Sequence, residues 1–332
     1  MLHLIALRDF PTIGLLDFPK RYGLSRNAIP YPTGILSILT FLLIFGYTAP
    51  WTLQSAGIAI SILLLTLISF LDDRYTIHPA VRLVGQALIA FIIFATGSRI
   101  YTLTNPLLAD GMINLDTINI LFPLSSFRFP LVLPLWSGIF TIIWLMITMN
   151  ALNWFDGIPG QVSTLSTIGF LVIGSLAMSD RVQQPEVALI AFILAGIAAA
   201  GLLFDFPPNK VLMGDTGAMF FGLMLGVLTI YSGGKVATAF LVLGVPLIDL
   251  AIVIVRRILK KHNPLRGNST DEHLHHRLLR KRWSSRMIIT LTAGLGTLFG
   301  TAALFFSTTQ KMVAAGVLFA VMLLLSLYTS KS

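Results

Sequence analysis

Apolar segments of 17 to 21 residues recur along almost the whole of this 332-residue chain, and they restrict its fold more than any other feature. A helix needs about 20 apolar residues to cross a bilayer, and it satisfies its own backbone hydrogen bonds there. Hydrophobic residues make up 55% of the chain and charged residues 11%, which excludes an ordinary soluble domain. The sequence therefore predicts an all-α, polytopic membrane protein, a single integral-membrane domain over residues 1–332 with about ten transmembrane helices. The predicted spans are 33–49, 54–71, 79–96, 134–151, 160–178, 185–204, 216–232, 235–254, 286–306 and 312–329.

Basic residues are divided unequally between the two sides on which the loops alternate. One side holds 18 of the 23 Lys and Arg residues, including those of an N-terminal arm (1–32) and a His/Arg-rich loop (255–285). Basic loops are retained in the cytoplasm, so this side is predicted to be the cytoplasmic face of a cell membrane. The net charge of +9 favours the membrane and anionic lipid or phosphate as partners, and disfavours nucleic acid. The chain has no cysteine, which excludes disulfides and thiolate chemistry.

Asp72 and Asp73 end the second predicted span, on the predicted cytoplasmic side. Two adjacent carboxylates at the mouth of a membrane span are costly unless a positive group binds them. Hard oxygen ligands suit Mg²⁺, and such a pair can share the ion with substrate phosphates. The alternative is a solvated loop, but the other polar clusters of the chain fall on the same side and favour an active site there.

Another polar cluster consists of Asn150, Asn153, Asp156 and Gly157. The two Asn and the Asp are spaced by three residues, which places their side chains roughly on one face of a helix end. Amides donate and accept, and a carboxylate accepts, so this set suits the edge of a base or a sugar. A helix C-terminus capped by Asn and Gly explains the same residues equally well.

Asp215, in Gly214-Asp215-Thr216-Gly217, stands where a loop enters a helix. In a functional interpretation, Asp215 supplies a third carboxylate to a metal ion, and Lys210 binds a phosphate. An N-terminal cap of the following helix is the stronger alternative.

His273, His275, His276 and Arg277 cluster in the basic loop. Without cysteine and among basic neighbours, they favour binding of an anion such as a diphosphate over binding of zinc. A loop held on anionic lipid explains the Arg and Lys residues but not the clustered His.

Two further charged residues lie in or near predicted spans. Asp249 stands about five residues inside the cytoplasmic end of its span, where an ionisable group indicates function. Arg82 shares a helix face with Gln86, four residues later, and is predicted either to snorkel or to hold a lipid phosphate.

Four other classes of membrane protein fit the residues poorly. An intramembrane aspartyl protease requires Gly-x-Gly-Asp, and Leu212 replaces the first Gly. An aromatic prenyltransferase would have a further Asp soon after Asp73, and a CDP-alcohol phosphotransferase would have Ala-Arg after Gly157. A transporter would place its charges near mid-bilayer, whereas these lie at one interface.

From about Leu16 to Leu279 the chain resembles the polyprenyl-phosphate N-acetylhexosamine-1-phosphate transferase superfamily, glycosyltransferase family 4. Each motif is weak alone, but five in the right order form a specific signal. They are Leu71-Asp72-Asp73-Arg74, Asn150-x-x-Asn153-x-x-Asp156-Gly157, Met213-Gly214-Asp215-Thr216-Gly217, Pro246-x-x-Asp249 and His273-Leu-His275-His276-Arg277-Leu-Leu.

The resemblance implies that a polyprenyl phosphate attacks the β-phosphate of a UDP-N-acetylhexosamine and releases UMP, with Mg²⁺ as cofactor and Mn²⁺ as the alternative. It implies Asp215 as the Mg²⁺ ligand, with Asp72 and Asp73 handling the lipid phosphate and the metal and Asp72 a candidate base. Asn153 and Asp156 would contact the nucleotide, and the His273–His276 loop the diphosphate and sugar. The form of that loop resembles the N-acetylglucosamine branch of bacterial enzymes for surface glycans more than the phospho-N-acetylmuramoyl-pentapeptide transferases. A homodimer is left open.

Three departures from the family pattern keep a second hypothesis open, a catalytically idle relative that binds polyprenyl phosphate or UDP-sugar. The family usually has one further span before the arm, where this chain has only Met1–Leu7. Pro159 replaces a second Asp of an Asp-Gly-x-Asp-Gly pattern, and Asp205 stands where the family usually has Asn, which adds a negative charge beside the expected diphosphate site.

Overall fold

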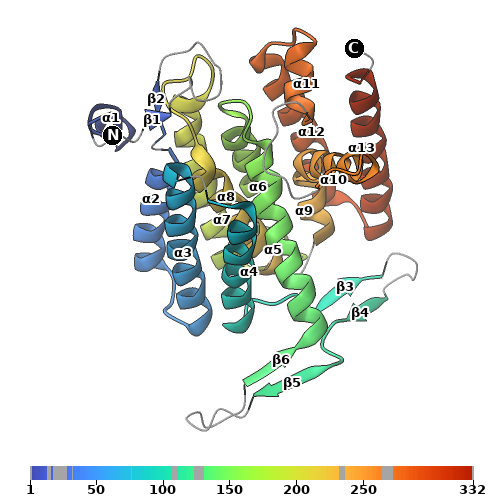
Figure 1. Cartoon of the computed structure of the whole chain (residues 1–332). Helices are drawn as coiled ribbons and strands as arrows, with labels where there is room; N and C mark the ends of the chain where they lie inside the picture. Colours follow the sequence, from blue (N-terminus) through green and yellow to red (C-terminus); the bar gives the residue numbers. More distant parts are fainter. Residues whose placement is uncertain are drawn as a thin grey trace.

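The computed structural model describes residues 2–12, 16–17, 28–31, 33–75, 77–105, 111–122, 131–231, 236–263 and 272–330. Parts of the predicted arm and of the predicted 255–285 loop lie outside these ranges. Helices dominate the described residues and stand side by side in a bundle (Figure 1). They are α1 (Leu2–Asp9), α2 (Thr33–Thr48), α3 (Leu53–Tyr75), α4 (Pro79–Ala95), α5 (Leu135–Phe155), α6 (Gln161–Met178), α7 (Pro185–Asp205), α8 (Gly214–Tyr231), α9 (Val236–Val242), α10 (Gly244–Leu259), α11 (Leu274–Arg280), α12 (Ser285–Phe305) and α13 (Thr308–Tyr328).

Each of the ten predicted spans coincides with helix, which confirms the all-α, multi-pass membrane class. Within the described part of the chain, seven helices are long and apolar enough to cross a membrane, or eight if α9 and α10 form one bent span. The other two, α2 and α4, are apolar but shorter. The count of ten is therefore approximate.

The predicted span 235–254 is not one straight helix, because α9 and α10 meet at an angle of 84°. Leu243 separates them, and Pro246 stands in the first turn of α10. In a continuous helix, the proline ring would collide with the carbonyl of Val242, four residues earlier. The apolar pattern of the segment predicted a helix, and Pro246 explains why this helix is interrupted before α10.

Helix α8 is the centre of the bundle, with 83% of its apolar window buried. Its glycines allow α5 to approach closely, since a Cβ at Gly222 would meet the backbone of Thr148 and Met149. Trp144 of α5 completes this contact by donating from Nε1 to the Gly226 carbonyl and to Thr229 Oγ1, at 3.3 and 3.1 Å. The first turn of α8, which carries Asp215, is thereby held on a rigid scaffold.

Short antiparallel strands lie in the loop between α4 and α5, where the sequence predicted no regular structure. Figure 1 shows them at the end of the bundle away from α11. They are β3 (Thr102–Thr104) paired with β4 (Met112–Asn114), and β5 (Asn119–Phe122) paired with β6 (Leu131–Pro134); β1 (Leu16–Asp17) pairs with β2 (Ile29–Pro30) before α2.

Candidate active site

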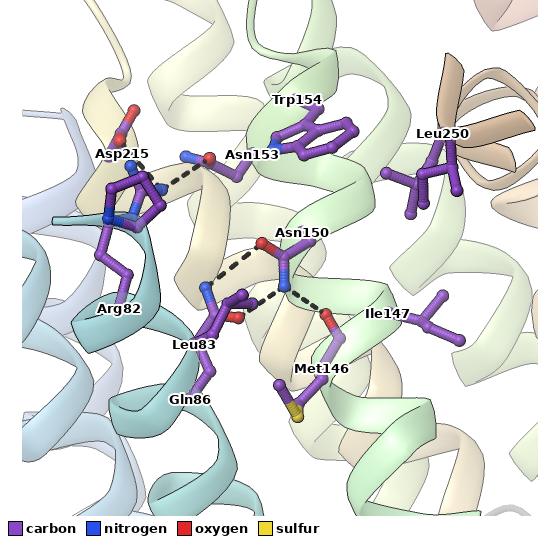
Figure 2. A pocket seen from close by; sticks show the side chains of 12 residues that line it. Arg82, Leu83, Gln86, Met146, Ile147, Asn150, Asn153, Trp154, Asp215 and Leu250 are labelled. Atoms are coloured by element: carbon purple, nitrogen blue, oxygen red, sulfur yellow. Dashed lines mark hydrogen bonds and ion pairs between the residues drawn. The ribbon is translucent and has the colours of Figure 1, made fainter. Parts of the chain in front are cut away.

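Arg82 of α4 joins three of the predicted site residues. Its Nη1 lies 2.8 Å from Asp72 Oδ2, and its Nη2 lies 3.4 Å from Asp215 Oδ2. The same Nη2 donates to Asn153 Oδ1 at 3.0 Å, and Figure 2 shows Arg82, Asp215 and Asn153 turned toward one another. Residues from α3, α4, α5 and α8 therefore meet at one guanidinium. A planar guanidinium suits this role, because its donors are arranged as a fork.

Local structure brings Asp72 to Arg82. Asp72 lies near the end of α3, and its Oδ1 accepts from the Ile77 amide at 2.7 Å in the turn that follows. His78 caps the N-terminus of α4 and Pro79 occupies its first turn, a position that needs no amide hydrogen. The turn is short, so Arg82 stands one helical turn above it and beside Asp72.

Asp215 is positioned by a close approach of two helices. Gly214 adopts a left-handed φ of 74°, which a residue with a Cβ rarely adopts. A Cβ on Gly34 of α2 would lie 2.6 Å from Gly217 Cα, and the Gly34 amide donates to the Met213 carbonyl at 3.2 Å. The glycines of the Gly-Asp-Thr-Gly motif thus let α2 pack closely against the first turn of α8, which carries Asp215.

Gln86 and Asn150 form a second polar contact one turn deeper in the bundle. Asn150 Nδ2 donates to Gln86 Oε1 at 2.5 Å and to the Met146 carbonyl at 2.8 Å. Gln86 Nε2 donates in turn to Asn150 Oδ1 at 3.3 Å (Figure 2). Gln86 is buried. The predicted substrate ligand Asn150 therefore has an internal partner, which ties α4 to α5 beneath Arg82.

A cavity of about 260 Å³ opens beside Arg82. Arg82, Asn153 and Asp215 lie at its polar end, and Trp154 stands next to them. The remaining wall is largely apolar and comes from α4, α5 and α10. It consists of Pro79, Leu83, Gln86, Met146, Ile147, Asn150, Leu250 and Ile254. The cavity can therefore receive an anionic head at one end and a hydrocarbon chain along the other.

The predicted metal ligands are placed only in part by the structure. Asp72 is buried and Asp215 is 37% exposed at the side chain, and both face the same cation. The side chain of Asp73 lies outside the described ones, and no group of three His, Cys, Asp or Glu among the described side chains is arranged to hold a metal. Two carboxylates that already share one positive charge nonetheless suit a divalent ion, because it offers the same charge complementarity to hard oxygen ligands.

Asp249 and His273 form a buried pair instead of facing the cavity. His273 Nδ1 lies 2.8 Å from Asp249 Oδ2, and Asp249 Oδ1 accepts from the Leu274 amide at 3.0 Å. The ring of His273 meets that of Trp154 edge to face, with centroids 5.4 Å apart. Direct contact of these two residues with substrate stays a prediction; in the structure they lie behind Trp154, which lines the cavity.

His275 is buried next to the turn that ends α5. Its ring stacks on His273, with centroids 5.7 Å apart, and its Nε2 fills the space that a Cβ on Gly157 would need. Burial, and then the neighbouring His276 and His273, hold the pKa of His275 well below its usual value. A neutral His275 thus packs against the Asn153–Gly157 turn and fixes its position.

The other predicted ligands do not line the cavity as far as the described residues define it. Arg277 is buried and donates from Nη1 to the Ser326 carbonyl at 3.0 Å, and burial followed by the charge of Arg256 lowers its pKa to about 10. Lys210 is exposed, and Asp156, Gly157 and His276 are partly exposed at nearby turns. Asp205 is also buried away from the cavity, where it accepts from Ser163 Oγ at 2.6 Å.

Sequence reasoning did not assign Trp154 and Arg257 to the site. Trp154 lines the cavity, and Arg257 lies over its ring, with Cζ 5.0 Å from the centroid. Arg257 is itself buried and pairs with Glu272 at 2.6 Å. The position of Trp154 directly after Asn153 is the signal in the sequence that pointed to it, while the contact with Arg257 requires the tertiary structure.

The fold and this site define a polytopic membrane transferase, and comparison with known sequences identifies its family. The model of glycosyl transferase family 4 matches residues 55–233, and the chain belongs to that family.

Among curated proteins, the chain is 28% identical to a probable undecaprenyl-phosphate N-acetylglucosaminyl 1-phosphate transferase of Bacillus subtilis, over 88% of this chain and 77% of the relative. It is 28% identical to a decaprenyl-phosphate N-acetylglucosaminephosphotransferase of Mycolicibacterium smegmatis, over 80% and 67%. It is 25% identical to the undecaprenyl-phosphate α-N-acetylglucosaminyl 1-phosphate transferase of Escherichia coli K12, over 88% and 77%.

Proposed function

We propose that this family 4 enzyme transfers N-acetylglucosamine-1-phosphate from UDP-N-acetylglucosamine to a polyprenyl phosphate such as undecaprenyl phosphate, and releases UMP. The observation that carries the proposal is Arg82, held between Asp72 and Asp215 at the polar end of a cavity with an apolar wall. A lipid phosphate has the same two parts, a charged head and a hydrocarbon chain. The names of the relatives support the same acceptor and sugar.

The reaction needs positioning and charge neutralisation more than proton transfer. An oxygen of the lipid phosphate attacks the β-phosphorus of the UDP-sugar, and the bond from that phosphorus to the oxygen bridging the α-phosphate breaks. The bridging oxygen leaves as part of UMP. A phosphate is already ionised at neutral pH, so no base is required to generate the nucleophile, and Asp72 acts chiefly through its charge. Arg82 holds the attacking phosphate by charge-assisted hydrogen bonds.

We further propose Mg²⁺ as the cofactor, with Mn²⁺ as a substitute. Asp215 and Asp72 would hold it, together with Asp73, and when bound it would neutralise charge on the diphosphate. Asp215 is the principal ligand, because it is the more exposed of the two described carboxylates and lies on the cavity wall.

The nucleotide and sugar are assigned to the polar end of the cavity, next to Arg82. Asn153 and Trp154 lie there, and the turn through Asp156 and Gly157 follows. An amide and an indole offer hydrogen bonding and stacking to a base. Asp249, His273 and His275 would act as positioning residues, which keep Trp154 and this turn in place.

The proposed setting is the cytoplasmic face of a bacterial cell membrane, where the product would begin the synthesis of a surface glycan. The excess of basic residues on the side that carries Asp72 and Asp215 supports this orientation.

The test is UMP release by the detergent-purified protein, given UDP-N-acetylglucosamine, undecaprenyl phosphate and Mg²⁺. We expect release that requires both lipid and metal, and that falls by at least about 100-fold in Asp215→Asn. Asp116→Asn is the matched control, because Asp116 is exposed at the other end of the bundle.

Assays with other UDP-sugar donors distinguish the two remaining alternatives, a different sugar donor and a catalytically idle relative. Release only from UDP-N-acetylmuramoyl-pentapeptide would reassign the donor. Binding of UDP-sugar without release from any donor would establish a catalytically idle relative and overturn the proposal.

A further inference from the structure

Gln161 is a buried amide at the start of α6, and the proposed mechanism gives it no role. The residue is 1% exposed, and neither Oε1 nor Nε2 has a hydrogen-bond partner among the described residues. It directly follows Gly160, whose left-handed φ of 85° ends the turn between α5 and α6. Burial of an amide without a partner is costly, and native proteins satisfy nearly all such groups with protein atoms or ordered water. The side chain of Gln161 therefore indicates a partner that can donate and accept.

A second buried polar side chain, His275, lies against the same turn. His275 is 2% exposed, and neither ring nitrogen has a hydrogen-bond partner in the part of the chain that the structure describes. Its Nε2 fills the space that a Cβ on Gly157 would need, which leaves Nδ1 as the nitrogen with room for a partner. A neutral imidazole has one donor and one acceptor nitrogen, so its requirement is the same as that of the Gln161 amide.

A small cavity of about 10 Å³ lies between these two side chains. Gln161 and His275 both line it, together with Asp249 and Thr292, and the other lining residues are apolar. Both oxygens of Asp249 already have partners. The Thr292 hydroxyl donates to carbonyls of its own helix, α12, so its oxygen can still accept. The volume is that of about one water molecule and is too small for a phosphate, a sugar or a lipid.

We propose that an ordered water molecule occupies this cavity and bridges Gln161 to His275, with Thr292 as a third partner. Water donates and accepts, so one molecule can meet an amide, a neutral imidazole and a hydroxyl together. A hydrogen bond through such a water is nearly as favourable as a direct one. The water thereby joins the first residue of α6 to α11.

The bridge makes Gln161 a positioning residue for the UDP-sugar. His275 packs on Gly157 and Gln161 follows Gly160, so the water fixes both ends of the turn that is assigned to the nucleotide and sugar. Arg82, which holds the lipid phosphate in the proposed reaction, does not line this cavity. The effect on the UDP-sugar rests on the proposed function, whereas the water site itself does not.

A high-resolution map of the detergent-purified full chain tests the water directly. We expect a peak within hydrogen-bond distance of both Gln161 and His275, in a map that shows ordered water elsewhere in the bundle. A map of that quality without the peak, or with a direct hydrogen bond between the two side chains, would overturn the proposal.

Steady-state UMP release tests the positioning role. Gln161→Leu removes the amide but keeps a side chain of similar size. Its KM for the UDP-sugar should rise by about fivefold, which corresponds to one hydrogen bond, while its KM for the lipid acceptor stays unchanged. Thr292→Val removes a second partner of the water with little change in shape. It should shift the KM for the UDP-sugar in the same direction, and it tests the site even if Gln161→Leu fails to fold.

Ser166→Ala is the matched control. Ser166 is another buried residue of α6 whose hydroxyl has no partner within the described residues, but it does not line the cavity, so both KM values should stay unchanged. Equal rises of the two KM values in Gln161→Leu, or no rise for the UDP-sugar, would overturn the positioning role. A wild-type protein that shows the water but releases no UMP from any UDP-sugar would instead overturn the proposed function and leave the water site in place.

Discussion

Arg82 Nη1 lies 2.8 Å from Asp72 Oδ2, and this contact joins the end of α3 to the first turns of α4. The Asp72 side chain is 7% exposed and that of Arg82 is 21% exposed, so the pair is largely shielded from water. Because Arg82 also reaches Asp215 and Asn153, one guanidinium sets the spacing of groups from three other helices. The position of the cation therefore depends on the fold as a whole, and a phosphate entering the cavity meets a charge that is already oriented.

Two substitutions of Arg82 should distinguish the contribution of its positive charge from that of its planar guanidinium shape. In Arg82→Gln the cation is lost, and kcat/KM for the lipid acceptor should fall by about 100-fold or more. Arg82→Lys keeps the charge but lacks the planar fork by which the guanidinium spans Asp72, Asn153 and Asp215, so an intermediate loss is expected. Steady-state UMP release at varied lipid concentration measures both. Arg286→Gln is the matched control, because Arg286 is bound to the Pro207 carbonyl on an exposed surface; equal losses there would contradict a specific role.

Removal of one partner of the Gln86–Asn150 pair should destabilise the protein more than removal of both. Gln86→Leu leaves the Asn150 amide without its buried partner, at a cost of about 1–3 kcal/mol. The double variant Gln86→Leu with Asn150→Leu loses both polar groups together, so its effect should be smaller than that of either single variant. Unfolding in detergent, followed for all four proteins, gives the coupling. Additive effects would show that the two amides do not depend on each other.

A methyl group at Gly157 should disturb the site through His275. In Gly157→Ala the new Cβ overlaps His275 Nε2, so either the ring or the turn must shift. We expect a lower unfolding temperature and weaker UDP-sugar turnover, and partial rescue when His275→Ala is added. Gly196→Ala is the control, because nothing lies within 4 Å of a Cβ there and helical Ala is favoured over Gly by about 0.5–1 kcal/mol. A Gly157→Ala protein as stable as Gly196→Ala would refute the contact.

Stability should fall in mildly acidic solution because of His275. Its pKa is held well below 6.5 in the folded chain by burial, whereas the unfolded chain binds a proton near 6.5. The unfolded state therefore takes up more protons as the pH falls below 6.5, and folding loses up to about 1.4 kcal/mol per pH unit from this group. Above that pH the effect is absent.

Unfolding of wild type and His275→Gln between pH 7.5 and 5 measures this contribution. The variant should show the shallower decline, while His262→Gln, at an exposed position, should follow wild type. Parallel curves for wild type and His275→Gln would contradict a neutral buried imidazole.

The apolar pattern was sufficient to predict the helices of the bundle, and the alternation of loops placed Asp72, Asn153 and Asp215 at one end of it. Both inferences rest on local properties: the length of an apolar run, and the side on which it ends. The pattern did not reveal the strands β3 to β6, because their pairing depends on residues that approach one another only when the loop folds back. Nor did hydropathy reveal the bend between α9 and α10, since both helices are apolar.

The sequence by itself determined the family and the candidate site residues, because motifs such as Gly214-Asp215-Thr216-Gly217 can be read without coordinates. Only the tertiary structure decided which of them share a cavity. It placed Arg82 between Asp72 and Asp215, paired Asp249 with His273 behind Trp154, and buried His275 against Gly157. The physical reason is that the surroundings of a charge depend on its neighbours in space. A partner from another part of the chain holds Asp249 away from the cavity beside Arg82, and no spacing along the chain records that partner.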